Sequence, residues 1–297
     1  MSLRLWILTW LMRLVVRPML ARATTPAVAR CDLERVARLF RAPPYMLHLV
    51  GRDSTPPLHW ISVGRPDDRT VMLYFHGGAY LAGSPATHAA MLGRLAKLTG
   101  LRVAAPAYRL APEHPAPAAF EDACAAHGAL MAQGYAPNRV VLGGDSAGGG
   151  LALALLADLC GRGLRPAGLF AFSPWTDMGL TGASLTENAA LDPLLPASRI
   201  TETVGHLRGD LPVTDPRISP LYASFTAPPP VWFQVGTTEI LRDDSRRMAA
   251  HLRDAGGKAT VTEWLGAPHV WQLFDGYIPE ARAALMEVSG FVRAITL

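Results

Sequence analysis

A serine flanked by glycines is the strongest chemical signal in the sequence. Ser146 stands in Gly144-Asp145-Ser146-Ala147-Gly148, which has the G-x-S-x-G spacing of a nucleophile on a tight turn. The apolar β-type run Arg139–Leu142 precedes the pattern, and the small and apolar helical run Leu151–Leu156 follows it. Glycines on both sides let neighbouring backbone approach a strained turn without a Cβ clash. This context predicts a strand, a sharp turn and a helix that present Ser146 as a nucleophile.

Glycine-rich turns after strands also hold phosphate groups, so a second interpretation has to be weighed. A phosphate loop ends in Gly-Lys-Ser or Gly-Lys-Thr, and that ending is absent after Gly148. No dinucleotide-binding fingerprint fits the segment either. A nucleophilic serine requires a base, an acid that orients the base, and donors for an oxyanion. In one large class of serine hydrolases built on an α/β sheet, the acid and then the histidine follow the serine along the chain.

Three histidines follow Ser146 in the sequence. His251 falls within a helical run, and His206 lies in a segment that departs from the strand and helix rhythm. His269 follows the last strand-like run, in the loop Gly266–Trp271, where the base of such an enzyme is expected. The sequence therefore predicts His269 as the base.

The acid is expected in the loop after the preceding strand, Val231–Val235. Glu239 comes first in that loop, whereas Asp243 and Asp244 directly precede a helical run and have the position of N-cap residues. We therefore predict Glu239 as the acid that fixes the tautomer of the base, with Asp243 as the alternative.

Donors for the oxyanion are predicted after the strand Val71–Phe75, at His76-Gly77-Gly78-Ala79-Tyr80. Consecutive glycines at a strand end let the backbone turn its N–H groups inward, as in the lipase-type oxyanion loop. We assign the oxyanion hole to the N–H groups of Gly77, Gly78 and Ala147. His76 is expected to anchor this loop by hydrogen bonds and not to act as a base.

Strand-like and helical runs alternate from about residue 58 onward, which predicts an α/β fold with a mostly parallel sheet and helices on both faces. The predicted strands are Leu58–Val63, Val71–Phe75, Arg102–Ala107, Val140–Gly143, Gly168–Phe172, Val231–Val235 and Ala259–Trp264, and the predicted helices span 87–99, 116–134, 149–162, 242–256 and 280–295. The first two strands flank the turn-rich stretch Gly64–Asp68, which predicts a hairpin.

Two segments depart from this alternation. Residues 1–50 have a helical pattern, and residues 180–218 are rich in Pro, Asp and Leu. Both are candidates for a cap over the carboxyl ends of the strands, where ligands bind in open α/β sheets. We therefore expect a helical cap segment over 1–50 and a catalytic domain over 51–297, with 180–218 contributing to the cap.

The composition limits the functional classes. Of 297 residues, half are hydrophobic and 18% are charged, as in an ordinary globular protein. The net charge of +4 comes from scattered arginines without an aromatic-interleaved basic patch, which argues against nucleic-acid binding. The three cysteines form neither a disulfide framework nor a metal-ligand pattern, which fits the cytoplasm. No metal or organic cofactor is implied.

The apolar N-terminal run Leu3–Val16 carries Arg4 and Arg13 and is too short to span a bilayer. A signal peptide is one interpretation, since Arg4 precedes the apolar stretch Leu5–Met12. The favoured interpretation is an amphipathic helix that covers the active site or makes weak contact with a membrane surface.

Several motifs together resemble the hormone-sensitive lipase family of esterases, over nearly the whole chain. The matching segments are His76-Gly77-Gly78, Tyr108-Arg109-Leu110-Ala111-Pro112-Glu113-His114-Pro115, Gly144-Asp145-Ser146-Ala147-Gly148-Gly149 and Ser173-Pro174-Trp175-Thr176-Asp177. The resemblance implies an α/β-hydrolase fold with a helical cap. It also implies a serine carboxylesterase that hydrolyses short- to medium-chain acyl esters, which are small-molecule substrates, through an acyl-serine intermediate.

The sequence departs from the family pattern in two places. The family's acid opens an Asp-Pro-Leu-x-Asp stretch, and here Glu239 occupies that position; the third glycine of the family's oxyanion loop is Ala79 here. The resemblance further implies that the Tyr108–Pro115 stretch is a structural brace, with Glu113 and Asp122 in structural roles. Asp145 is expected to be a hydrogen-bond acceptor that holds the loop.

Three questions stay open at the level of sequence. An amidase or deacetylase would use the same three residues, and a non-catalytic ligand receptor on the same fold would lack the histidine, which is retained here. The family resemblance also makes a homodimer through the edge strand Ala259–Trp264 and the C-terminal helix an alternative to a monomer.

Overall fold

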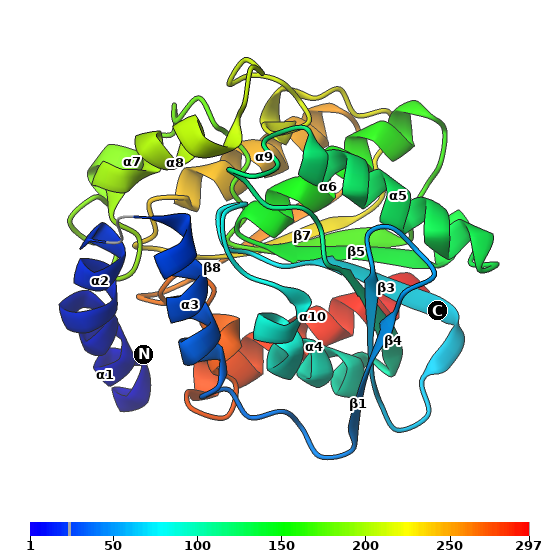
Figure 1. Ribbon diagram of the computed structural model, residues 1–297, viewed down its shortest axis with the longest axis horizontal. Coiled ribbons are helices and arrows are strands. Elements are labelled where there is room, and N and C mark those ends of the chain that lie inside the picture. The colour runs from blue at the N-terminus through cyan, green and yellow to red at the C-terminus, as the bar shows by residue number, and fades with distance from the viewer. Residues whose placement is uncertain (23–24, 297) are drawn as a thin grey trace.

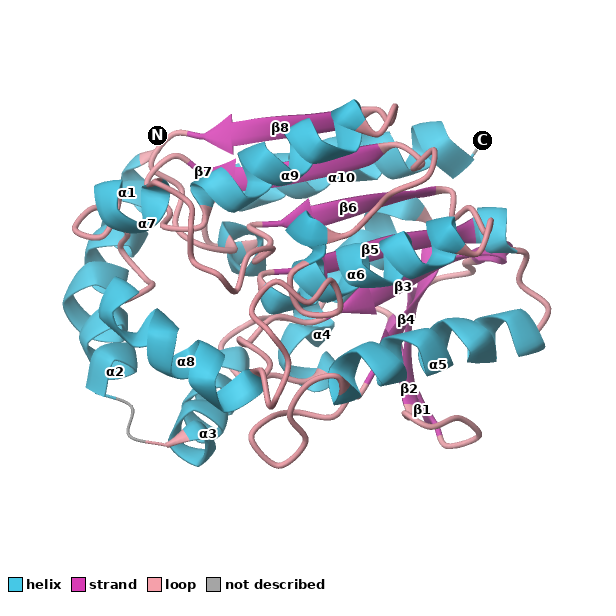
Figure 2. Ribbon diagram, turned by 90° about the horizontal axis from the view of Figure 1, so that it is seen from above, coloured by secondary structure: helices cyan, strands magenta, loops and turns pink. Residues whose placement is uncertain are grey.

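The computed structural model describes residues 1–22 and 25–296, and in them eight strands form one sheet in the order β1-β2-β4-β3-β5-β6-β7-β8 (Figures 1 and 2). The antiparallel edge comprises β1 (Met46–Gly51), β2 (Leu58–Val63) and β4 (Leu101–Pro106). The parallel part continues from β4 through β3 (Asp67–Phe75), β5 (Val140–Asp145), β6 (Gly168–Phe172), β7 (Val231–Gly236) and β8 (Ala259–Trp264). The predicted α/β-hydrolase fold with a mostly parallel sheet is confirmed.

The predicted hairpin of β2 and β3 is wrong, because β4 lies between these two strands. Leu58 of β2 pairs with Pro106 of β4, whereas Val71 of β3 pairs with Arg102 of β4 and with Val140 of β5. Residues 70–75 are buried throughout, as expected for a central parallel strand covered on both faces. Turn residues between two strands fix a short connection, but they do not fix which strands pair.

A second difference lies at the edge strand β1, Met46–Gly51, because residues 46–50 belong to the segment 1–50 for which a helical pattern is predicted. Met46 and His48 are partly buried, while Leu47 and Leu49 point outward and are exposed. Because apolar residues occupy both faces of this strand, the alternation that would have identified it is hidden.

Alternate residues of the central strands face two different helical layers, as the period of two in a strand requires. Leu73 and Phe75 pack with α5 (Ala118–Ala132), α6 (Ala147–Gly161) and α9 (Arg242–Asp254). Met72 and Tyr74 pack on the opposite face with α4 (Pro85–Thr99) and α10 (Pro279–Thr296). Figure 1 shows these two layers above and below the sheet.

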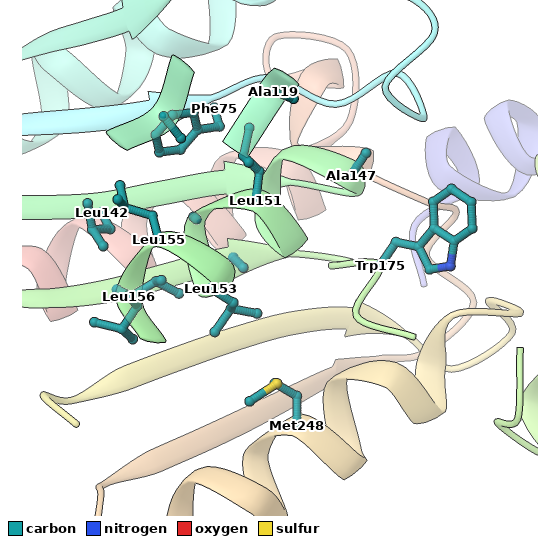
Figure 3. Packing of buried hydrophobic residues seen from close by; sticks show 14 of the residues in the cluster. Phe75, Ala119, Leu142, Ala147, Leu151, Leu153, Leu155, Leu156, Trp175 and Met248 are labelled. Carbon is teal, nitrogen blue, oxygen red and sulfur yellow. The ribbon is translucent and has the colours of Figure 1, made fainter. Parts of the chain in front are cut away.

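Helix α6 carries Ser146 at its N-terminal end and is buried along most of its length. Figure 3 shows Leu151 and Leu155 of this helix packed beside Phe75 and Leu142 of the sheet. The helix can lie this close because its first turn is glycine-rich: a Cβ at Gly148 would lie 2.1 Å from the carbonyl oxygen of Phe75. The glycines after Ser146 therefore set the position of the nucleophile relative to the sheet.

Helices from two distant parts of the chain lie beyond the carboxyl ends of the strands (Figure 2). They are α1 (Leu3–Leu11), the π-helical turn Met12–Val16, α2 (Arg17–Arg22), α3 (Pro26–Ala37), α7 (Ser184–Glu187) and α8 (Ile200–Leu207). Short 3-10 turns occupy Pro137–Arg139, Ala197–Arg199, Pro220–Tyr222 and Trp271–Phe274.

Two arginines join these distant segments. The guanidinium of Arg13 donates to the carbonyl of Leu191 at 2.7 Å, and that of Arg17 donates to the carbonyl of Ala189 at 2.5 Å. Among the described helices, none combines the length and apolar character needed to cross a bilayer.

Candidate active site

Ser146 occupies the single residue between the end of β5 and the start of α6. Its backbone has φ 53° and ψ −124°, a conformation that residues with a Cβ rarely adopt. The N–H of Ser146 donates to the carbonyl of Phe172 at 2.8 Å, and its carbonyl accepts from the N–H groups of Gly150 and Trp175. The surrounding backbone thus holds the serine in the strained turn that was predicted from its glycines.

His269 lies in the loop after β8 and reaches Ser146 across 123 positions of sequence. Its Nε2 is 2.9 Å from Ser146 Oγ, and its Nδ1 is 2.6 Å from Glu239 Oε2. Because the carboxylate can only accept at Nδ1, that nitrogen carries the proton and Nε2 is left as the acceptor for the serine hydroxyl. The structure therefore brings Ser146, His269 and Glu239 into one hydrogen-bonded line.

Glu239 is fully buried in the loop after β7. Its Oε1 accepts from the Ser173 hydroxyl at 2.8 Å and from the Gly236 N–H at 2.5 Å, which leaves Oε2 directed at His269. Asp243, the alternative acid, accepts instead from the Ser184 N–H and forms ion pairs with neighbouring arginines of α9.

Sequence reasoning missed the groups that hold the acid. Ser173 stands at the end of β6 with φ 47°, and Asn188 donates its amide to the carbonyl of Glu239 at 2.8 Å. Asp192 accepts the N–H of Ile240 at 2.9 Å, and burial together with the charge of Glu239 raises the pKa of Asp192. The one sequence signal for these supporting groups is the position of Ser173, directly after β6, the strand that pairs with β7.

Asp243 and Asp244 are not N-cap residues, because α9 begins at Arg242. Both lie in the first turn of α9, where the positive end of the helix dipole stabilises a carboxylate. Asp244 accepts from the N–H groups of Thr176 and Asp177 at 2.7 and 3.0 Å and so fastens the loop after β6. Burial, with a contribution from the charge of Asp177, raises the pKa of Asp244 to about 7.

The glycines predicted for the oxyanion hole lie beside the nucleophile turn. A Cβ at Gly77 would lie 2.2 Å from Asp145 Oδ2, and Gly78 has φ 119° with an equally close approach to the carbonyl of Ala82. Ala147 is the first residue of α6, where a helix leaves its N–H without an acceptor of its own. Within 1–22 and 25–296, the three N–H groups donate to no protein acceptor.

Buried side chains keep this loop in place. His76 Nδ1 donates to the Gly77 carbonyl at 2.8 Å, and the Tyr108 hydroxyl donates to the His76 carbonyl at 2.7 Å. Burial, and then the charge of His88, lower the pKa of His76 to about 3, so its imidazole is neutral at neutral pH. Asp145 accepts from the Tyr74 hydroxyl at 2.9 Å, in the loop-holding position expected for it.

Two residues of the Tyr108–Pro115 stretch, Arg109 and Glu113, form ion pairs with other elements. Arg109 pairs with Asp122 at 2.8 Å and with Glu121 at 3.1 Å on the next helix. Glu113 pairs with Arg30 of α3 at 2.6 Å, so this carboxylate ties the N-terminal helices to the sheet domain. Neither Glu113 nor Asp122 contacts Ser146 or His269.

A hydroxyl on a strained turn, an imidazole at hydrogen-bond distance from it, and a buried carboxylate behind the imidazole form the arrangement needed for acyl transfer. The N–H groups of Gly77, Gly78 and Ala147 have no protein acceptor among the described residues, as donors for the negative charge of a tetrahedral intermediate require.

Known proteins resemble this chain in sequence and in fold. Residues 72–273 match a family described by the alpha/beta hydrolase fold. An acetyl-hydrolase of Streptomyces hygroscopicus is 39% identical over 80% of this chain and 79% of that protein, and an esterase of Acinetobacter venetianus is 37% identical over 76% of each. The crystal structure of an esterase from the bacterial hormone-sensitive lipase family is 36% identical and covers 100% of this chain and 99% of that one, with a TM-score of 0.94.

Proposed function

The chain belongs to the alpha/beta hydrolase family, and within it to the hormone-sensitive lipase family of esterases, and on this premise we propose that Ser146, His269 and Glu239 hydrolyse short- to medium-chain acyl esters. The enzyme is a carboxylic-ester hydrolase. The observation that carries the residue assignment is the continuous hydrogen-bonded line from Ser146 Oγ through the imidazole to the Glu239 carboxylate.

In the first half of the reaction, Ser146 Oγ attacks the ester carbonyl while His269 Nε2 takes its proton. The imidazolium that forms is stabilised by the buried carboxylate of Glu239. The carbonyl oxygen becomes an oxyanion and accepts from the N–H groups of Gly77, Gly78 and Ala147. Collapse of the intermediate breaks the bond to the alcohol, which leaves with the proton from His269, and the acyl group stays on Ser146.

The second half repeats these steps with water as the nucleophile. His269 Nε2 removes a proton from water, and the resulting hydroxide attacks the acyl-serine carbonyl. The oxyanion accepts hydrogen bonds from the same three N–H groups. The intermediate then releases the carboxylic acid, and Ser146 Oγ regains its proton from His269. One imidazole thus serves as base and acid in both halves.

A short acyl group is supported by the surroundings of the nucleophile and by one relative. A Cβ at Gly150 would lie 2.1 Å from the Trp175 carbonyl oxygen and 3.5 Å from the Tyr80 hydroxyl, so the Trp175 backbone and the Tyr80 side chain lie close to the first turn of the helix that follows Ser146. The Streptomyces relative is named an acetyl-hydrolase, which fits a small acyl group. We propose that residues 1–50 and 180–218 act as a cap over the catalytic domain 51–297 and limit the length of the acyl chain of the substrate.

An acyl-chain series tests this substrate class. With p-nitrophenyl esters of two to sixteen carbons, kcat/KM is expected to peak at the short to medium chains and to fall for the longest, because the proposed cap limits the length of the acyl chain. Each ester should be run beside the anilide of the same acid. A maximum at the longest chains, or a preference for the anilide, would contradict the proposal.

The pH dependence follows from the state of His269. Burial lowers the pKa of His269, but the hydrogen bond and the charge of Glu239 raise it by more, so its pKa lies above the ordinary value. Because only the neutral imidazole accepts the serine proton, kcat/KM is expected to fall as the pH decreases through a value above about 6.5. An acid limb clearly below that value in a pH profile of kcat/KM would contradict this prediction.

Two further proposals concern the setting of the enzyme. Cys31, Cys124 and Cys160 are free thiols, which supports a cytoplasmic location. The strand β8 lies at the edge of the sheet, and this supports a homodimer built from β8 and α10. The hydrogen bond between His269 and Ser146 argues against a non-catalytic ligand receptor, which would lack this histidine.

A further inference from the structure

The helical segment Leu3–Arg22 is apolar on two opposite sides. Leu5 and Met12 are buried on the inner side, and Leu5 packs with Ala267 and Trp271, which flank His269. On the outer side Leu3, Ile7 and Leu14 are 71%, 52% and 67% exposed.

The exposed residues form a continuous face. Leu3, Ile7 and Trp10 follow the spacing i, i+4, i+7, which places them on one side of α1, and the exposed Leu14 lies in the π-helical turn that continues it. Trp6 and Trp10 pack edge to face next to them, with ring centroids 6.0 Å apart. The large apolar residues exposed on this segment are Leu3, Trp6, Ile7, Trp10, Leu11, Leu14 and Val15. A helix that only covers a core presents a polar outer side, so an apolar outer face indicates a binding surface.

The charges of the segment select the partner. Four arginines lie in Leu3–Arg22, and the first acidic residue of the chain is Asp32. Arg13 and Arg17 are used internally, bonded to the carbonyls of residues 191 and 189, whereas Arg4 and Arg22 are exposed. A second copy of the chain would bring a second set of arginines against the first, so like charges oppose self-association through this face.

We propose that the outer face of Leu3–Arg22 docks this protein on an anionic phospholipid surface. The apolar side chains enter the boundary between headgroups and acyl chains, Trp6 and Trp10 lie at that boundary, and Arg4 and Arg22 meet the lipid phosphates. The inner side of the same helix contacts the residues around His269. The docked protein therefore holds the loop that carries His269 about one helix diameter, roughly 10 Å, from the lipid.

Co-sedimentation with vesicles tests the proposal, and the full-length Ser146→Ala variant is used so that binding is measured without turnover. Vesicles of phosphatidylcholine mixed with phosphatidylglycerol are expected to bind the protein on the order of tenfold more tightly than phosphatidylcholine alone. This difference should shrink between about 0.1 M and 1 M NaCl, over which the screening length falls from about 10 Å to about 3 Å. An Arg4→Gln/Arg22→Gln variant should bind both kinds of vesicle about equally.

A matched pair of variants locates the contact. Ile7→Glu/Leu14→Glu is expected to lower the partition coefficient about tenfold or more. The control Leu49→Glu/Met286→Glu, in which both replaced residues are 54% exposed on other elements, should bind as the parent does. Circular dichroism and thermal melts check that all variants are folded.

Two results would overturn the proposal. One is equal sedimentation of the two double variants on anionic vesicles. The other is the absence of vesicle binding together with a dimer, seen by sedimentation velocity, that Ile7→Glu/Leu14→Glu dissociates. Because the readout is binding by an inactive variant, neither result bears on whether Ser146 is the nucleophile.

Discussion

Replacing Ser146 by alanine is expected to lower kcat on p-nitrophenyl butyrate by about 10⁶-fold, the order found when a triad serine is removed. The loss follows because no other hydroxyl contacts His269 Nε2 in the described hydrogen bonds, so the acyl group has no acceptor. Substrate binding does not use the serine hydroxyl as strongly as the transition state does, so KM should change far less than kcat.

A second serine on a helix is the matched control. Ser289 lies in α10 and its hydroxyl donates to the Met286 carbonyl at 2.8 Å, away from the nucleophile turn. Ser289→Ala should retain parental kcat. Because Ser146 Oγ makes one hydrogen bond among the described residues, with His269, the folded state should lose little on its removal, and melting curves check this. Near-parental turnover by folded Ser146→Ala would contradict the assignment of the nucleophile.

Glu239→Gln is expected to lower kcat about 10⁴-fold, the order known for the equivalent amide replacement in a serine protease triad. Two donors, the Ser173 hydroxyl and the Gly236 N–H, fix the orientation of the new side-chain amide, because both must bond to its oxygen. The amide NH₂ then faces His269 Nδ1 and forces the proton onto Nε2, where it cannot accept from Ser146. Steady-state kinetics at pH 8 measures the loss.

Two further observations make this prediction specific to Glu239. The acid limb of the pH profile should move down in the Glu239→Gln variant, because the carboxylate that raises the pKa of His269 is gone. Asp243→Asn is the matched control, since Asp243 holds the Ser184 N–H and not the imidazole, and it should change stability more than kcat. A larger loss of kcat in Asp243→Asn than in Glu239→Gln would reverse the assignment of the acid.

The parts of the site that depend on local backbone were predictable from the sequence. Ser146 needs a strained turn, and the glycines that permit this turn can be recognised in the sequence. His269 and Glu239 each follow a strand, and the loops after parallel strands meet at one edge of the sheet. The choice of Glu239 over Asp243 rested on position in the loop, and the contacts of both residues agree with it.

The supporting contacts depend on how distant segments meet, and sequence patterns do not carry that information. Ser173, Asn188 and Asp192 reach the loop of Glu239 from 66, 51 and 48 positions away. The pairing of β2 with β4 in place of β3 is a choice of partner that a turn cannot encode. The apolar N-terminal helix was predictable from composition, but its attachment through Arg13 and Arg17 to residues 189–191 was not.

Mass spectrometry after reaction with a fluorophosphonate ester tests the central claim most directly, because the reagent labels only an activated serine. We expect one phosphonyl adduct, on the peptide that contains Ser146. The labelling rate should decrease as the pH decreases through the pKa of His269 and should be nearly lost in His269→Ala. An adduct on a different serine, or an unchanged labelling rate in folded His269→Ala, would contradict the account of Ser146, His269 and Glu239 as one catalytic unit.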